Sequence, residues 1–187
     1  EKKIILVPGR LTSWKGQELL IEAINLVKIE LGYEAFHVVI LGSDQGRNLY
    51  KKKLISLTEQ YCLTNQIKFI DHCEDMALAY QVSDIVISPS IEPEAFGRVA
   101  VESQSMEKLI IASNIGGSNE TIINEKTGFL FESGDANSLS KKIIRAITMD
   151  ETSLKLIGKE ARKNIIEKFN VEKMCFSTYS EYKKLLN

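Results

Sequence analysis

Two hydrophobic patterns alternate along the chain: short continuous apolar runs, and longer segments in which apolar residues recur every three or four positions. The short runs are rich in Ile, Val and Leu at consecutive positions, as expected for parallel strands that are buried on both faces. They predict strands at residues 3–9, 37–42, 67–71, 84–90 and 109–113, and a sixth at 128–131.

Segments of helical period separate these runs. The first has an apolar stripe made of Leu20, Ala23, Ile24, Val27 and Leu31. Further helices are predicted at residues 47–62 and 75–81, after residue 97, from residue 118, from residue 136, and at 151–168 and 171–186. Asp135 is the expected N-cap of the helix from residue 136, because its carboxylate can accept a free backbone N–H.

Alternating strands and helices predict an α/β fold: a doubly wound, Rossmann-like parallel sheet of about six strands, with helices on both faces and further helices at the C-terminal end. No repeat or linker interrupts residues 1–187, which predicts a single domain. Ligands bind such sheets at the carboxyl ends of the strands, near the switch in strand order. Candidate site residues are therefore expected in the loops that follow strands.

Composition and charge exclude several classes of function. The net charge of −1 argues against a nucleic-acid partner, although a local pair of cations can still bind a phosphate. The three cysteines lie far apart without a CxxC motif, so we expect reduced thiols, no metal site and a cytoplasmic protein. No apolar run approaches the ~18–20 residues of a membrane span. The chain starts without Met, almost inside its first strand, and we expect it to be part of a longer protein.

The loop after the first strand carries Gly9, Arg10 and Lys15. Two cations beside a helix start can hold a pyrophosphate without a metal, because the free amides there also favour an anion. The alternative is a solvated Arg and Lys on an exposed loop. The P-loop pattern is absent, because no Ser or Thr follows a GxxxxGK sequence.

The next two strands end in weaker signals. Gly42 permits a close backbone approach to a ligand, but a turn glycine has the same appearance. GxGxxG is absent, which disfavours a nicotinamide or flavin cofactor. His72, after the third strand, is more typical of a surface or capping residue than of a catalytic base.

The fourth strand leads into a loop and helix that contain Glu94 and Glu102. At ~1.5 Å per helical residue the two carboxylates lie roughly 8–12 Å apart, which fits a sugar–diphosphate–ribose unit held lengthwise. Each acid would accept hydroxyls at one end, and the amides from Phe96 through Gly97 and Arg98 to Val99 would face the diphosphate. Two solvated surface glutamates are the alternative. After the fifth strand, Gly116 and Gly117 offer backbone donors at a helix start.

Taken in order, these motifs resemble the donor-binding half of retaining glycosyltransferases of family 4, which have the GT-B fold. The resemblance covers nearly the whole chain. The residues that carry it are Gly9, Arg10, Lys15 and Gly16; Pro89, Ser90, Glu94, Phe96, Gly97 and Glu102; Gly116, Gly117 and Glu120; Thr127 to Leu130; and Gly134 with Asp135. Arg98 departs from the family pattern, since an aliphatic residue is common at that position.

The resemblance implies roles for these residues. Arg10 and Lys15 would hold the diphosphate of a UDP-, GDP- or ADP-sugar and stabilise the leaving group, while Glu94 positions the transferred sugar. Glu102 would bind the ribose. The loop that contains His72 and Cys73 would border the base. Family members generally need no divalent metal, so no cofactor is expected.

The resemblance also implies a missing part. The family's N-terminal acceptor domain is not in this chain, and in relatives the final helices pack back toward it. We expect the chain alone to transfer sugar poorly, because it can neither exclude water nor position an acceptor. A role in cell-envelope or polysaccharide biosynthesis is expected, with the full-length protein in the cytoplasm or peripherally at the inner face of a membrane.

Three alternatives remain at the level of sequence. A sugar-nucleotide epimerase can share this architecture, although no convincing acid/base set is visible. A non-catalytic nucleotide-sugar-binding or interaction domain would keep the fold with a vestigial site. A receiver domain would need acidic residues after the first strand, where this chain has Pro8, Gly9 and Arg10.

Overall fold

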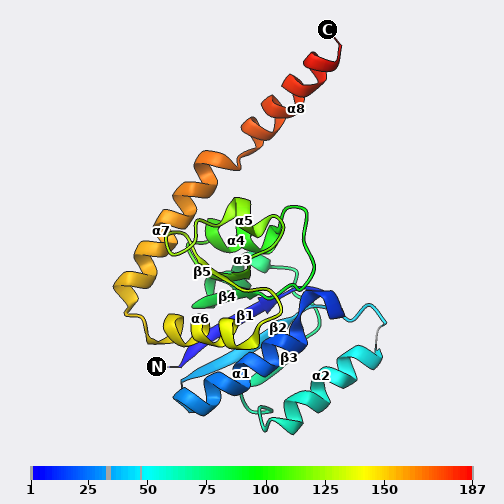
Figure 1. Ribbon diagram of the computed structural model, residues 1–187, viewed down its shortest axis with the longest axis vertical. Coiled ribbons are helices and arrows are strands. Elements are labelled where there is room, and N and C mark those ends of the chain that lie inside the picture. Colours follow the sequence, from blue (N-terminus) through cyan, green and yellow to red (C-terminus); the bar gives the residue numbers. More distant parts are fainter. Residues whose placement is uncertain (1, 33–34, 47, 187) are drawn as a thin grey trace.

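The computed structural model describes residues 2–32, 35–46 and 48–186. In this part of the chain, six strands form one parallel sheet in the order β3-β2-β1-β4-β5-β6 (Figure 1). The strands are β1 (Lys3–Pro8), β2 (Phe36–Leu41), β3 (Ile67–Ile70), β4 (Ile85–Ser88), β5 (Leu109–Ser113) and β6 (Phe129–Phe131). The predicted doubly wound sheet is confirmed, with its switch in strand order between β1 and β4.

Every predicted helix is present. The helices are α1 (Gln17–Leu31), α2 (Asn48–Gln60), α3 (Met76–Gln81), α4 (Arg98–Ser105), α5 (Ser118–Thr121), α6 (Ala136–Thr148), α7 (Glu151–Lys168) and α8 (Val171–Leu185). The predicted start of α2 at Arg47 lies outside the described residues. A short 3₁₀ turn, η1 (Ser13–Lys15), was not predicted. Asp135 caps α6 as expected, accepting hydrogen bonds from the backbone N–H groups of Asn137 and Ser138.

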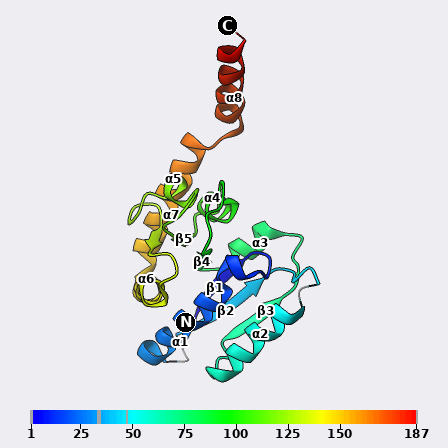
Figure 2. The same ribbon diagram turned by 45° about the vertical axis from the view of Figure 1, so that its right-hand side comes forward.

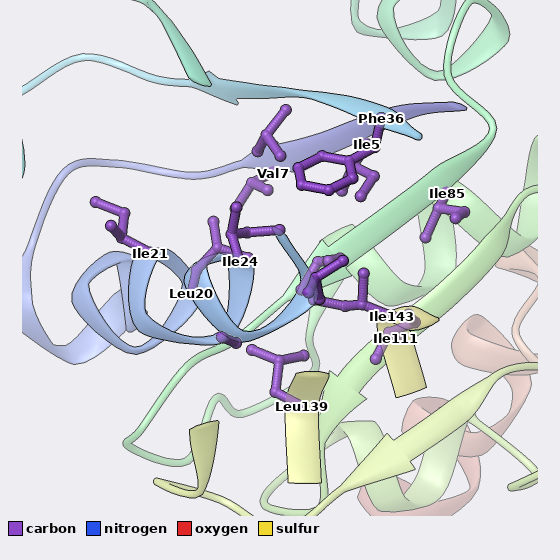
Figure 3. Close-up of a cluster of buried hydrophobic side chains, with 14 of the residues drawn as sticks. Ile5, Val7, Leu20, Ile21, Ile24, Phe36, Ile85, Ile111, Leu139 and Ile143 are labelled. Atoms are coloured by element: carbon purple, nitrogen blue, oxygen red, sulfur yellow. The ribbon is translucent and has the colours of Figure 1, made fainter. Parts of the chain in front are cut away.

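Buried side chains cover both faces of the sheet, as predicted. Ile5 and Val7 of β1 point to the face covered by α1, α2 and α6, where Figure 3 shows them gathered with Leu20 and Ile24 of α1. Leu6, between them, points to the opposite face, which is covered by α3, α4 and α5. Each fully buried aliphatic side chain of this kind contributes about 1.5–3 kcal/mol to folding. The two clusters therefore hold the helices of both faces against the sheet.

The last two helices differ in how they pack against the rest of the domain. α7 packs against α4, whereas α8 has no buried residue and extends away from the sheet with the C-terminus at its tip (Figures 1 and 2). Several large apolar side chains of α8 are exposed, among them Met174, Phe176, Tyr182 and Leu185. No helix in the described part of the chain is both long and apolar enough to cross a membrane.

Candidate donor-binding cleft

The loops after β1 and β4 meet at the switch in strand order. Gly16 adopts φ 71°, and a Cβ atom at this position would lie 1.9 Å from the carbonyl oxygen of Pro89. Next to this close approach, the backbone N–H of Ile91 donates to the carbonyl of Trp14 over 2.8 Å. The two loops therefore form one continuous wall, and a side chain at residue 16 would separate them.

A cleft of two adjoining compartments opens above this wall. The first, of about 690 Å³, and the second, of about 320 Å³, share the lining residues Gly9, Arg10, Arg98, Val99 and Glu102. The first extends toward α3 and has an apolar floor that includes Met76, Tyr80 and Met106. The second contains Trp14, Lys15, Glu94, Phe96 and Gly97. Arg10, Lys15, Glu94 and Glu102 thus converge on a single cleft.

Lys15 and Glu94 are joined directly. The ammonium of Lys15 lies 2.7 Å from Oε1 of Glu94, and the two side chains are only 12% and 20% exposed. The hydroxyl of Ser90 donates to the same oxygen over 2.5 Å. Glu94 is therefore held by one charged and one neutral donor, each from a different position along the wall.

Trp14 lies beside both cations. The Lys15 ammonium is 4.6 Å and the Arg10 guanidinium 5.9 Å from the centre of its ring, within the range of a cation–π interaction. Arg10 forms no ion pair with any residue that the structure describes. Its guanidinium is exposed in the cleft, where it is available to an anion.

Glu102 is held from below the cleft. The phenol of Tyr80 donates to Oε2 of Glu102 over 2.8 Å. Near this pair lies the start of α4, whose N-cap residue, Gly97, has no side chain to cap the first amides of the helix. These amides carry partial positive charge at the cleft, where Arg98 adds a full charge.

The remaining predicted residues divide into two groups. Gly42, His72 and Cys73 line the first compartment, as their place after the second and third strands predicted. Gly116 and Gly117 line neither compartment; they pack behind the loop, where the N–H of Gly117 donates to the carbonyl of Glu94 over 2.8 Å. The amide of Gly117 is therefore already used, and direct contact of either glycine with a donor stays a prediction.

Sequence reasoning missed Trp14 and Tyr80. Trp14 had a visible signal, since an aromatic residue stands beside Lys15 and four positions from Arg10. Tyr80 had none, because its partner Glu102 lies 22 positions away and on another helix. Among the described residues, no three His, Cys, Asp or Glu side chains are grouped so that they could hold a metal ion.

This fold and cleft define an α/β domain whose candidate ligand site lies at the carboxyl ends of parallel strands, at the switch point. Residues 1–169 match the family model described as glycosyl transferases group 1, and the chain belongs to this family. The predicted membership of a glycosyltransferase family is confirmed at this level.

Known relatives agree with this membership. The chain is 28% identical over 178 residues to the capsular polysaccharide biosynthesis glycosyltransferase CapM of Staphylococcus aureus, covering 95% of this chain and 45% of CapM. A glycosyltransferase structure from Rickettsia africae superimposes with a TM-score of 0.92 at 37% identity, covering 100% of this chain and 48% of that one. HepE from Anabaena, solved in complex with UDP and glucose, has a TM-score of 0.88 at 26% identity over 98% of this chain and 48% of its own.

The chain thus spans about half the length of these relatives. The structures matched are GT-B-like in this half, and the six-stranded sheet and C-terminal helices have the same arrangement. Activity, substrates and partners of the whole protein are therefore matters for proposal.

Proposed function

We propose that this chain is the donor-binding domain of a retaining glycosyltransferase of family 4, which transfers a sugar from a nucleoside diphosphate sugar to an acceptor. The observation that carries the proposal is the convergence of two cations and two carboxylates, Arg10, Lys15, Glu94 and Glu102, on one cleft at the switch point. A nucleoside diphosphate sugar has an anionic centre with hydroxyl groups on both sides, and this arrangement complements it.

In this proposal the diphosphate lies between Arg10, Lys15 and the first amides of α4. As the bond from the sugar to the phosphate breaks, negative charge grows on the leaving diphosphate. Preorganised cations and helix amides stabilise this charge more in the transition state than in the ground state. Two side-chain cations serve this purpose without a divalent metal, and we propose that none is required.

The carboxylates would recognise the two hydroxyl-bearing ends. Glu102 lies between the compartments and would accept the ribose hydroxyls, leaving the base in the apolar first compartment beside His72 and Cys73. Glu94 lies in the second compartment and would orient the transferred sugar. Donor binding then exchanges part of the Lys15–Glu94 ion pair for contacts with phosphate and sugar hydroxyls.

The relatives suggest which donor to test first and what completes the enzyme. The structures of HepE with UDP and with UDP-glucose support uridine nucleotides as first probes. Relatives of about twice this length support a second domain that supplies the acceptor site. We propose that transfer requires that domain, that the protein acts in the cytoplasm, and that the product is a polysaccharide or envelope glycan.

Calorimetric titration tests the proposal. UDP, GDP, ADP and their glucose conjugates are titrated into the folded protein, and saturable binding of at least one pair is expected. Glu102→Ala should weaken binding of the nucleoside diphosphate and the sugar nucleotide alike. Glu94→Ala should mainly weaken the sugar nucleotide. No binding of any of these ligands to a folded sample would overturn the assignment, and equal losses for both ligands in both variants would overturn the two roles.

A further inference from the structure

Tyr80 joins the hydrophobic layer beneath the cleft to the cleft itself. The residue is 2% exposed, and its ring packs in the cluster that contains Val86, Ala100 and Ile110. Its hydroxyl emerges from this layer and donates to Oε2 of Glu102 over 2.8 Å. A buried ring has little rotational freedom, so the position of the hydroxyl is set by the packing of the sheet.

The short helix that carries Tyr80 is fixed at both ends. At its start, the carboxylate of Asp75 accepts the backbone N–H of Leu78. At its end, the ammonium of Lys108 donates to the carbonyls of Gln81 and Ser83, each over 2.8 Å. These bonds satisfy backbone groups that a six-residue helix otherwise leaves free. The Tyr80 hydroxyl is therefore held at a fixed position beside Glu102.

The carboxylate of Glu102 is partly exposed in the cleft, and Tyr80 is the only described residue that donates a hydrogen bond to it. Oxygen Oε1 is left to accept from a ligand. A carboxylate with one oxygen fixed loses less rotational freedom when it binds, and this raises its affinity for a pair of adjacent hydroxyls.

Resting on the proposed function, we propose that Tyr80 is a positioning residue that orients Glu102 toward the ribose diol and thereby makes the site prefer ribonucleotides. Tyr80 lies at the floor of the first compartment but is almost completely buried, so its phenol acts mainly through the carboxylate of Glu102. Burial, together with the hydrogen bond to Glu102, raises the pKa of Tyr80 well above its usual value. Its phenol therefore stays protonated at neutral pH and can donate to the carboxylate.

The decisive measurement compares a ribonucleotide with its dideoxyribose form on one sample. The nucleoside diphosphate that the wild-type protein binds most tightly, among UDP, GDP and ADP, is titrated into the wild type and into Tyr80→Phe. The cost of ordering a Glu102 carboxylate that is no longer held by Tyr80 predicts roughly two- to tenfold weaker binding of the ribonucleotide. The dideoxy form should bind equally well to both proteins. Since both ligands are measured on one preparation, their affinity ratio does not depend on the folded fraction.

Tyr50→Phe is the matched control, because Tyr50 is a partly buried tyrosine whose hydroxyl donates to Gln17 outside the cleft. It should leave the ratio of ribonucleotide to dideoxynucleotide affinity unchanged. In Glu102→Gln, adding Tyr80→Phe should lower the ratio little further, because the two residues act as one unit. Equal weakening of both ligands by Tyr80→Phe, or an unchanged ratio, would overturn the inference while leaving the proposed function standing. A wild-type protein that binds no nucleotide would overturn both.

Discussion

The ammonium of Lys15 lies 2.7 Å from the carboxylate of Glu94, so the cation expected on the diphosphate is paired with the acid expected on the sugar. Freeing Lys15 should therefore help a phosphate ligand. In Glu94→Gln, UDP binding should remain equal to that of the wild type or become up to about fivefold tighter, as loss of a competing ion pair of about 1 kcal/mol predicts. Calorimetry with UDP measures this effect.

A double-mutant cycle measures whether the Lys15–Glu94 ion pair competes with the ligand. Lys15→Met should weaken UDP binding more in the Glu94→Gln background than in the wild type, since Lys15 has no competing partner there. Additive effects, or weaker UDP binding by Glu94→Gln alone, would show that the pair does not compete with the ligand.

Trp14 should contribute to anion binding through its two neighbouring cations. Replacing it with Leu removes the ring that lies 4.6 Å from the Lys15 ammonium and 5.9 Å from the Arg10 guanidinium. At about 0.5–1 kcal/mol for each of the two contacts, UDP should bind roughly five- to thirtyfold more weakly. Trp14→Phe keeps a ring and should lose less. Uridine, which has no phosphate, should be insensitive to both changes, and an equal loss for uridine would contradict this role.

The close approach of the two cleft loops should make Gly16 intolerant of any side chain. Alanine there would place a Cβ atom 1.9 Å from the carbonyl oxygen of Pro89 at φ 71°. We expect Gly16→Ala to lower the free energy of unfolding by roughly 3 kcal/mol or more and to weaken UDP binding, because Lys15 moves with the loop.

Gly134→Ala is the control that measures the cost of the backbone conformation without the steric clash expected at Gly16. Gly134 has a similar φ of 79°, and nothing lies within 4 Å of the position that its Cβ would take. Urea unfolding should show a loss of about 1 kcal/mol from the strained conformation alone. Similar losses for both substitutions would mean that the loops separate at little cost.

The pH dependence of stability should include a contribution from Glu125. Burial would raise the pKa of this carboxyl, but hydrogen bonds from Lys142 and Arg145 of α6 outweigh it and lower the pKa below its usual 4.5. A carboxylate with a lowered folded-state pKa stabilises the protein above its unfolded pKa, and this stabilisation is lost as pH falls through the folded value.

Glu125→Gln should therefore reduce stability at neutral pH and flatten the decline below pH 4.5. Urea unfolding across that range measures both effects. Glu181→Gln is the control, because the pair of Glu181 with Lys184 is largely exposed, with side chains 67% and 70% accessible, and should contribute little. An identical acid profile for Glu125→Gln and the wild type would contradict the assignment.

Much of the fold could be predicted because it depends on local patterns. The apolar runs mark the strands, and caps such as Asp135 and Asp75 mark where helices begin. Strand ends were less certain: the predicted strand to residue 90 stops at Ser88, because Pro89 has no N–H to continue the ladder. The order of the strands was not predicted, because right-handed crossovers restrict the possible orders without selecting one.

The convergence of residues on the candidate site could be predicted only for those in loops or helices that follow a strand. Arg10, Lys15, Glu94 and Glu102 each follow a strand, and parallel strands bring their carboxyl ends together. Tyr80 could not be found in this way, because its partner depends on how α3 packs beside α4.

For Gly116 and Gly117, the sequence suggested a role in ligand binding where the structure shows a role in packing. The composition of this pair indicates backbone donors free for a ligand, but the space it leaves is filled by protein. A Cβ on Gly116 would lie 2.6 Å from the carbonyl oxygen of Glu94, and one on Gly117 would lie 2.6 Å from that of Phe96. These residues are small so that the loop bearing Glu94 can lie on them.

The extended α8 has a thermodynamic consequence. Helices of about 12–15 residues are marginal in water by themselves, and α8 buries none of its side chains. The stability of this helix therefore depends on the surface that its apolar side chains contact, rather than on packing against the sheet. The rate of amide deuterium exchange along residues 171–185 would consequently report whether α8 is in contact with another surface. Exchange should be rapid while α8 is uncovered and slow once a surface covers it.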